Sequence, residues 1–204
     1  TFFDGKKMIL DKNYPNPDLN ETLIRVGSFS ICFLMLLLIE WRSPLVRYRD
    51  VWTIHRFTNI LFLLSTVGTS RLLISMSAVS AAIFAQSNSF GFFNVFQVHA
   101  GVSLIITLIV LDFLIYLQHI IMHLVPFLWR FHQIHHADER LDTTTGFRFH
   151  PGEIFFSAVY KWLIVFLLGP SIVAVVVFEI ILNSFSLFTH SNSKLLSRYQ
   201  VILE

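Results

Sequence analysis

The sequence predicts an all-α integral membrane protein, a bundle of about four to five transmembrane or re-entrant helices with a histidine-rich cytoplasmic cap. Composition is the first observation, because 54% of the 204 residues are hydrophobic and 14% are charged, against about 25% charged in soluble domains. The second is a set of long apolar segments, comparable with the ~20 residues that cross a bilayer core. The third is the stretch WRFHQIHHADERLDTTTGFRFHP at 129–151, which gathers four histidines.

The apolar segments lie at 23–39, 60–85, 98–117 and 154–189 and follow a polar N-terminal leader, residues 1–20, so the membrane domain is 21–204. The second segment contains Gly68 and Arg71, which predict a tilted, broken or partly interfacial helix because a lone arginine at that depth is costly. The fourth segment is too long for one crossing. Gly169-Pro170 divides it, since proline cannot continue a helix, into a predicted hairpin of helices 154–168 and 171–189.

Basic residues predict which ends of the helices face the cytoplasm. The loop after the first segment holds Arg42, Arg47, Arg49 and Arg56, whereas 86–97 holds no basic residue. The positive-inside rule therefore places the first loop in the cytoplasm. Three crossings return the chain to that side before the histidines, so we expect a multi-pass protein with its histidine cluster on the cytoplasmic face.

Charge and cysteine content exclude several classes of function. The net charge of +2 is small and scattered, so it gives no reason to expect binding to nucleic acid. Cys32 is the one cysteine and lies in an apolar run, which argues against disulfides, zinc ribbons and iron–sulfur clusters. Any bound metal must therefore have nitrogen and oxygen ligands.

The segment DFLIYLQHIIMH predicts one polar stripe on an apolar helix. Asp112, Tyr116, His119 and His123 fall within an arc of about 60° at ~100° per residue. His119 and His123 can share one metal, with Asp112 or Tyr116 orienting an imidazole from outside the ligand set. The alternative is a pair of interfacial histidines bonded to water or backbone.

A second group follows at His132, His135 and His136. Adjacent side chains on a helix diverge by about 100°. His135 and His136 would therefore bind two different metals, or one would bind a metal while the other forms hydrogen bonds around the ligand set. A solvated histidine-rich loop is the alternative, which the preceding HxxxH pair makes less attractive.

Two single histidines and several carboxylates lie nearby in the sequence. His150 precedes Pro151 and could turn toward the cluster or cap a helix, and His190 is the better ligand candidate. His55 and His99 match no cluster and are interpreted as structural. Four acidic residues lie beside the second group and could bind a metal or accept a hydrogen bond from an imidazole: Asp138, Glu139, Asp142 and Glu153. The alternative is a solvated charged loop, which is favoured for Glu139.

Many imidazoles with few carboxylates suit iron, copper, zinc or nickel. A metal at the membrane surface below apolar helices suggests a lipid substrate, and oxidation of an unactivated C–H bond requires a redox metal and O2, which favours iron. A metal-dependent membrane hydrolase or a divalent-metal transporter could use the same histidines, although transport sites lie nearer the bilayer midplane. A bis-imidazole haem protein would need histidines paired across the bilayer rather than gathered at one surface.

The segments DFLIYLQHIIMH, LWRFHQIHHADERLDTTTGFRFHPGE and FTHSN, with HRFTN at 55–59, resemble the signatures of the fatty acid hydroxylase superfamily in its sterol desaturase-like branch. The resemblance covers roughly residues 40 to 200. It implies a membrane di-iron oxygenase with two non-haem iron ions, which uses O2 and electrons from a reductase or cytochrome b5-type donor protein. It implies hydroxylation or desaturation of a sterol, fatty acyl chain or ether lipid in the bilayer.

Carried over by motif, the resemblance makes His119 and His123 the first histidine box and His132, His135 and His136 the second. His190 matches the HSN element and His150 the RFHP element, while Asp112, Tyr116 and Asp138 remain candidates for positioning the ligands. Family members carry a further HxxHH box after HSN, and this sequence stops at Glu204 before one. We expect a fragment that lacks the final box, rather than a protein that departs from the family, and it could be inactive alone.

Overall fold

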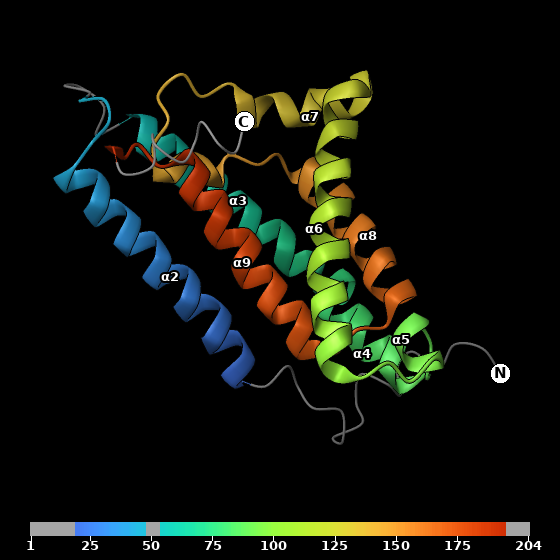
Figure 1. The fold of residues 1–204 in the computed structure, drawn as a ribbon. Coiled ribbons are helices and arrows are strands. Elements are labelled where there is room, and N and C mark those ends of the chain that lie inside the picture. The colour runs from blue at the N-terminus through green and yellow to red at the C-terminus, as the bar shows by residue number, and fades with distance from the viewer. Residues whose placement is uncertain (1–18, 48–53, 195–204) are drawn as a thin grey trace.

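The computed structural model describes residues 19–47 and 54–194, and these form a helical bundle (Figure 1). The long helices are α2 (Leu19–Arg42), α3 (Ile54–Leu72), α6 (Ala100–Leu124), α8 (Pro151–Leu168) and α9 (Ile172–His190). The short elements are η1 (Ile74–Met76), α4 (Ala78–Ser87), α5 (Phe92–Val95), α7 (Pro126–His136) and η2 (Thr143–Phe147). The all-α membrane fold is confirmed, and residues 1–18 of the predicted leader lie outside the described ranges.

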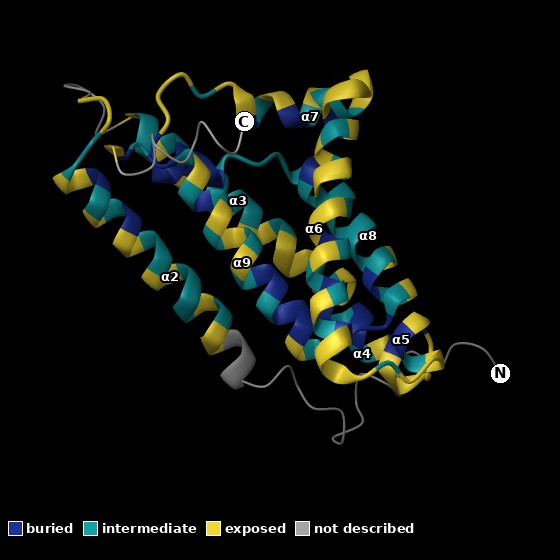
Figure 2. Cartoon of the chain, viewed as in Figure 1, coloured by how far each residue is buried: buried dark blue, intermediate teal, exposed yellow. Residues whose placement is uncertain are grey.

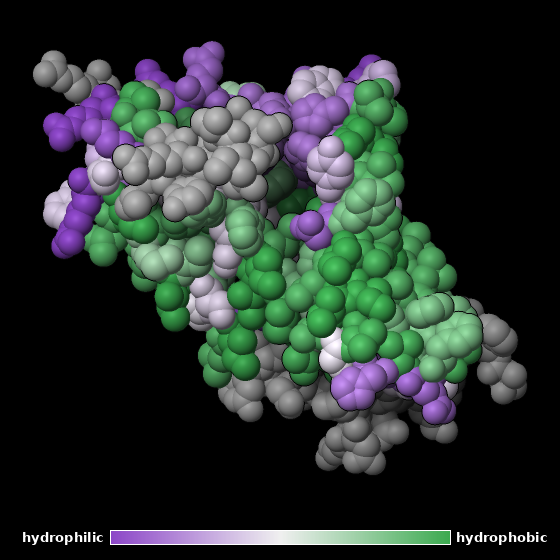
Figure 3. Space-filling view, viewed as in Figure 1, coloured by the Kyte–Doolittle hydropathy of each residue, from purple (hydrophilic) through white to green (hydrophobic). Residues whose placement is uncertain are grey.

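Within the described ranges, four helices are long and apolar enough to cross a membrane. They comprise Leu23–Arg42 of α2 and the whole of α6, α8 and α9. Their outer faces expose large apolar side chains such as Ile31, Ile109 and Val173, and apolar residues cover the length of the bundle in Figure 3. A helix that is apolar on its outer as well as its inner face belongs in lipid rather than water.

The second apolar segment is broken, one of the outcomes that its sequence predicts. Gly68 and Arg71 lie within α3, and the break comes after them, through η1 to Ser77. The Ser77 side chain accepts a hydrogen bond from the Ser80 backbone N–H and so starts α4 as its N-cap. α3 is not among the four candidate spans.

The larger cluster of buried apolar residues lies where α4 meets α8 and α9 (Figure 2), and a smaller one joins Leu36 of α2, Phe147 of η2 and Leu187 of α9. Ala81 and Ala82 of α4 are fully buried in one cluster with Val165 of α8 and Val175 of α9. Alanine permits close helix contact, as is typical of helix pairs in membranes. The predicted hairpin of α8 and α9 is confirmed, and Gly169 ends α8 in the left-handed conformation with φ 66°.

One end of the bundle carries the polar segments. α7 begins at Pro126, a residue suited to the first helical turn, and lies across the end of α6 (Figure 1). Glu40 of α2 fastens this end, because its buried carboxylate accepts hydrogen bonds from the Thr143 N–H at 2.7 Å and the Asn192 N–H at 2.6 Å. The last turn of α2, η2 and the end of α9 are therefore held together.

Candidate metal centre

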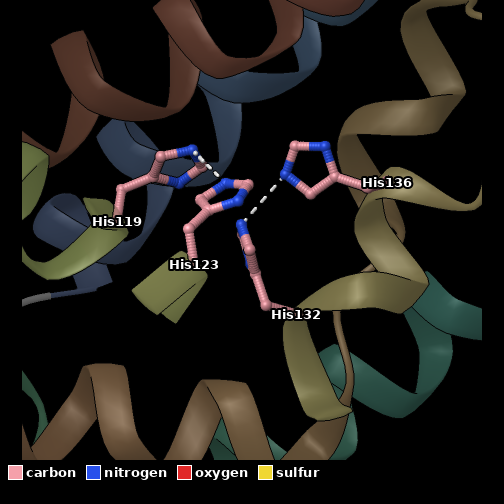
Figure 4. Close-up of side chains that lie close together, drawn as sticks. All are labelled: His119, His123, His132 and His136. Carbon is pink, nitrogen blue, oxygen red and sulfur yellow. Dashed lines mark hydrogen bonds between the residues drawn. The ribbon is translucent and has the colours of Figure 1, made fainter. Parts of the chain in front are cut away.

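Four histidines from two helices meet at this end (Figure 4). His119 and His123 project from α6, and His132 and His136 from α7. One nitrogen from each ring lies within 4.8 Å of the other three. His132 is buried, whereas the other three are exposed. These four side chains are called the histidine quartet below.

The quartet has the spacing of a metal ligand set. The Nε2 atoms of His119 and His123 are 3.2 Å apart, and those of His132 and His136 are 3.1 Å apart. Two nitrogens on one ion at ~2.1 Å and about 90° would be separated by about 3.0 Å. The facing nitrogens therefore match neighbouring positions around one transition metal, and the all-nitrogen donor set suits iron as well as zinc.

His135 belongs to a second group. Its Nε2 lies 3.0 Å from Nε2 of His190 at the end of α9. The structure thus separates the adjacent His135 and His136, as their angular divergence on a helix predicts. Burial first, and then nearby histidines beginning with His190, lower the pKa of His135 to about 3. The ring is neutral at physiological pH, which is the form that binds metal.

Glu153 supports the quartet from α8. Its carboxylate oxygen Oε1 accepts a hydrogen bond from Nδ1 of His132 at 2.8 Å, and both side chains are buried. This bond leaves Nε2 of His132 for a metal, the usual arrangement for a ligating histidine. The sequence made Glu153 one of four candidate carboxylates without separating it from the others. The feature of the sequence that could have singled out Glu153 is its position in the first turn of the helix that follows RFHP.

The remaining predicted site residues lie apart from the imidazole groups. His150 caps α8, because its Nδ1 accepts from the Gly152 N–H at 2.9 Å. Asp112 and Tyr116 are exposed on α6, and among the described hydrogen bonds neither contacts an imidazole of the quartet. The Asp138 carboxylate accepts instead from Thr145 at 2.7 Å and lies 2.7 Å from Nε2 of His55.

Side chains of the HRFTN and HSN motifs anchor the polar segments at the histidine end of the bundle. Arg56 donates to Asp142 at 2.9 Å and Asn59 to Thr144 at 2.8 Å, which ties η2 and its N-cap to α3. Asn192 accepts from the Val46 N–H at 2.9 Å and donates to the Val46 carbonyl at 2.8 Å. His190, two residues earlier, is thereby fixed at the end of α9.

A cavity of about 520 Å³ leads from the histidines into the bundle. His119, His132, His135 and His190 line it at one end, and apolar side chains such as Ile115 and Leu182 line it farther along α6 and α9. This volume is within the range of ligand pockets, roughly 300–1,000 Å³. A lipid chain reaching the histidines through this cavity would be shielded from water.

Fold and site together define a membrane-embedded helical protein with an imidazole-rich candidate metal centre. Residues 104–203 match the model of the family described as Fatty acid hydroxylase, a range that contains the quartet, His135 and His190. This match confirms the resemblance to the fatty acid hydroxylase superfamily. It suggests a membrane-bound oxidoreductase, a lipid hydroxylase or desaturase. Comparisons with curated proteins and with solved structures gave no significant match.

Proposed function

We propose that the protein is an O2-dependent, non-haem di-iron hydroxylase or desaturase that acts on a membrane lipid. The observation that carries the proposal is the meeting of four imidazole nitrogens within 4.8 Å of one another, with His119 and His132 on the wall of a cavity in an apolar bundle. The substrate class is a sterol, fatty acyl chain or ether lipid. An external reductase or cytochrome b5-type protein supplies electrons, and the histidine face is cytoplasmic.

In this proposal the quartet holds one iron, and His135 and His190 begin the ligand set of the second. When bound, the irons would supply the redox chemistry that directs O2 to an unactivated C–H bond. Glu153 keeps the proton of His132 on Nδ1 and so directs Nε2 to the metal. The cavity walls align the hydrocarbon and exclude water. Ligand or positioning roles for His150, Asp112, Tyr116 and Asp138 have weaker geometric support.

The deciding experiment measures metal content and turnover of the full-length protein in lipid nanodiscs. We expect two irons per chain and lipid oxidation that requires O2 and a reductant. Full lipid turnover by the zinc-loaded protein under anaerobic conditions would contradict the oxygenase proposal and favour a hydrolase, because hydrolysis needs only a Lewis acid.

A further inference from the structure

Three charged side chains, of which Glu179 is buried and the other two are half-buried, line the cavity away from the histidines. Arg25 of α2, Lys161 of α8 and Glu179 of α9 all line the same cavity as His119 and His190. Glu179 precedes His190 by eleven residues on α9, which is about 16 Å at 1.5 Å per residue. Charged residues at such a depth in membrane helices are costly and indicate a functional site.

The contacts of this charged group leave room for one more polar atom. Glu179 is buried and forms an ion pair with Arg25. The Lys161 Nζ forms a longer ion pair with Glu179, 3.9 Å from Oε1, a distance too long for a direct hydrogen bond. Oxygen atoms commonly bridge polar groups at such separations. An oxygen that accepts from Lys161 and donates to Glu179 fits this gap.

The cavity wall has further polar atoms that need a partner. Thr66 Oγ1 and Gln118 Oε1 are buried without a hydrogen-bond partner among the described residues, and both residues line the cavity. An unpaired polar atom in an apolar bundle costs free energy. A cavity filled with hydrocarbon alone would leave these atoms unpaired, whereas a cavity that also admits polar groups or water can satisfy them.

We propose that the cavity binds a lipid alcohol whose hydroxyl lies between Lys161 and Glu179 while its hydrocarbon portion extends to the histidines. A hydroxyl suits this position because it can accept from Lys161 and donate to Glu179 at once, whereas an ionised carboxylate can accept from Lys161 but has no proton to donate to Glu179. The carbon that reaches the metal centre is then remote from the hydroxyl. Binding of the alcohol does not depend on the proposed function. Its role as the substrate does.

Equilibrium binding of radiolabelled 1-octadecanol, octadecane and octadecanoate to the full-length protein in nanodiscs tests the proposal. We expect octadecanol to bind about tenfold more tightly than octadecane, the factor that one hydrogen bond to a charged group contributes. Octadecanoate should bind more weakly than the alcohol. Equal affinity for alcohol and alkane, or preference for the carboxylate, would overturn the proposal.

Variants locate the effect within the cavity. Lys161→Met and Glu179→Gln should lower the affinity for octadecanol toward that for octadecane and leave octadecane binding unchanged, whereas Lys161→Arg retains the preference. Glu139→Gln removes an exposed acidic group of the cap and should change neither affinity. Undiminished preference for the alcohol in both Lys161→Met and Glu179→Gln would refute the assignment of the hydroxyl to this pair.

Affinity for octadecanol and iron content are measured separately, so that failure of this inference can be told apart from failure of the di-iron proposal. Loss of iron binding with retained preference for the alcohol would count against the di-iron proposal alone, and full iron binding without that preference would count against this inference alone. Iron content and circular dichroism of each variant confirm that it is folded.

Discussion

His135 and His136 are neighbours in the sequence but contribute to different groups, one facing His190 and the other facing His132. Their substitution should therefore have different effects on metal binding. We expect His136→Ala to lower iron occupancy of the quartet and His135→Ala to leave it intact, while each abolishes lipid oxidation without preventing membrane insertion. Iron analysis of the full-length variants measures this difference. Loss of quartet iron in His135→Ala with full occupancy in His136→Ala would be contrary to the structure.

The hydrogen bond from His132 to Glu153 gives a second prediction at the residue scale. Without the carboxylate, His132 loses its fixed orientation, so Glu153→Ala should lower metal affinity by roughly 10–100-fold. Competition with a chelator measures this affinity. Glu139→Gln, a change at an exposed acidic residue of the cap, is the control. If the two variants released metal alike, Glu153 would have no specific role.

Residue spacing predicted that His119 and His123 face one another and that His135 and His136 diverge. It did not predict which histidine of the second group would join the first pair, because that depends on how α7 lies across the end of α6. It could not select Glu153, since the contact with His132 depends on how α8 packs against α7. It also left open whether His150 turns to the metal or to its own helix. In the structure the His150 ring accepts a hydrogen bond from the Gly152 N–H of its own helix.

At the scale of elements, the turn between α8 and α9 depends on Gly169. Its φ is 66°, and an added Cβ would lie 2.5 Å from Asn94 Nδ2 and 2.7 Å from the Phe90 carbonyl oxygen. Gly169→Ala should lower the free energy of unfolding by at least the ~1–2 kcal/mol cost of the left-handed conformation. Unfolding of the detergent-solubilised protein measures the change.

Gly27 provides the matched control because it lies within α2 with no atom near an added Cβ. Gly27→Ala should be neutral or stabilising by up to about 1 kcal/mol. A smaller loss of stability in Gly169→Ala than in Gly27→Ala would contradict the described turn.

The boundaries of the elements were predictable where the sequence has a strong helix breaker. Gly169-Pro170 predicted the division between α8 and α9 almost to the residue. The second apolar segment offered only Gly68 and Arg71, and helix α3 continues through both. The helix ends at Leu72, directly after Arg71, and a new helix begins after Ser77, where capping and the packing of the α4 alanines against α8 favour it.

At the scale of the whole molecule, α7, which carries two histidines of the quartet, and the loop after α4 lie at opposite ends of the bundle (Figure 1). If the histidine end is cytoplasmic, cysteines placed at the two ends should differ in labelling by an impermeant maleimide. We expect Asn88→Cys to react from outside intact cells and Glu139→Cys only after permeabilisation, in a Cys32→Ser background. Both positions are exposed. The reverse pattern would invert the topology and place the histidines outside.

The order of the histidines along the chain has a consequence for biosynthesis. The quartet is complete once α7 has been synthesised, whereas His135 meets its partner 55 residues later, at the end of α9. Chains emerge from the ribosome N-terminus first, at about 5–20 residues per second. The residues of the two histidine groups therefore leave the ribosome at different times. If the quartet binds a metal as proposed, its four imidazoles would be available before the last membrane helix has closed the bundle.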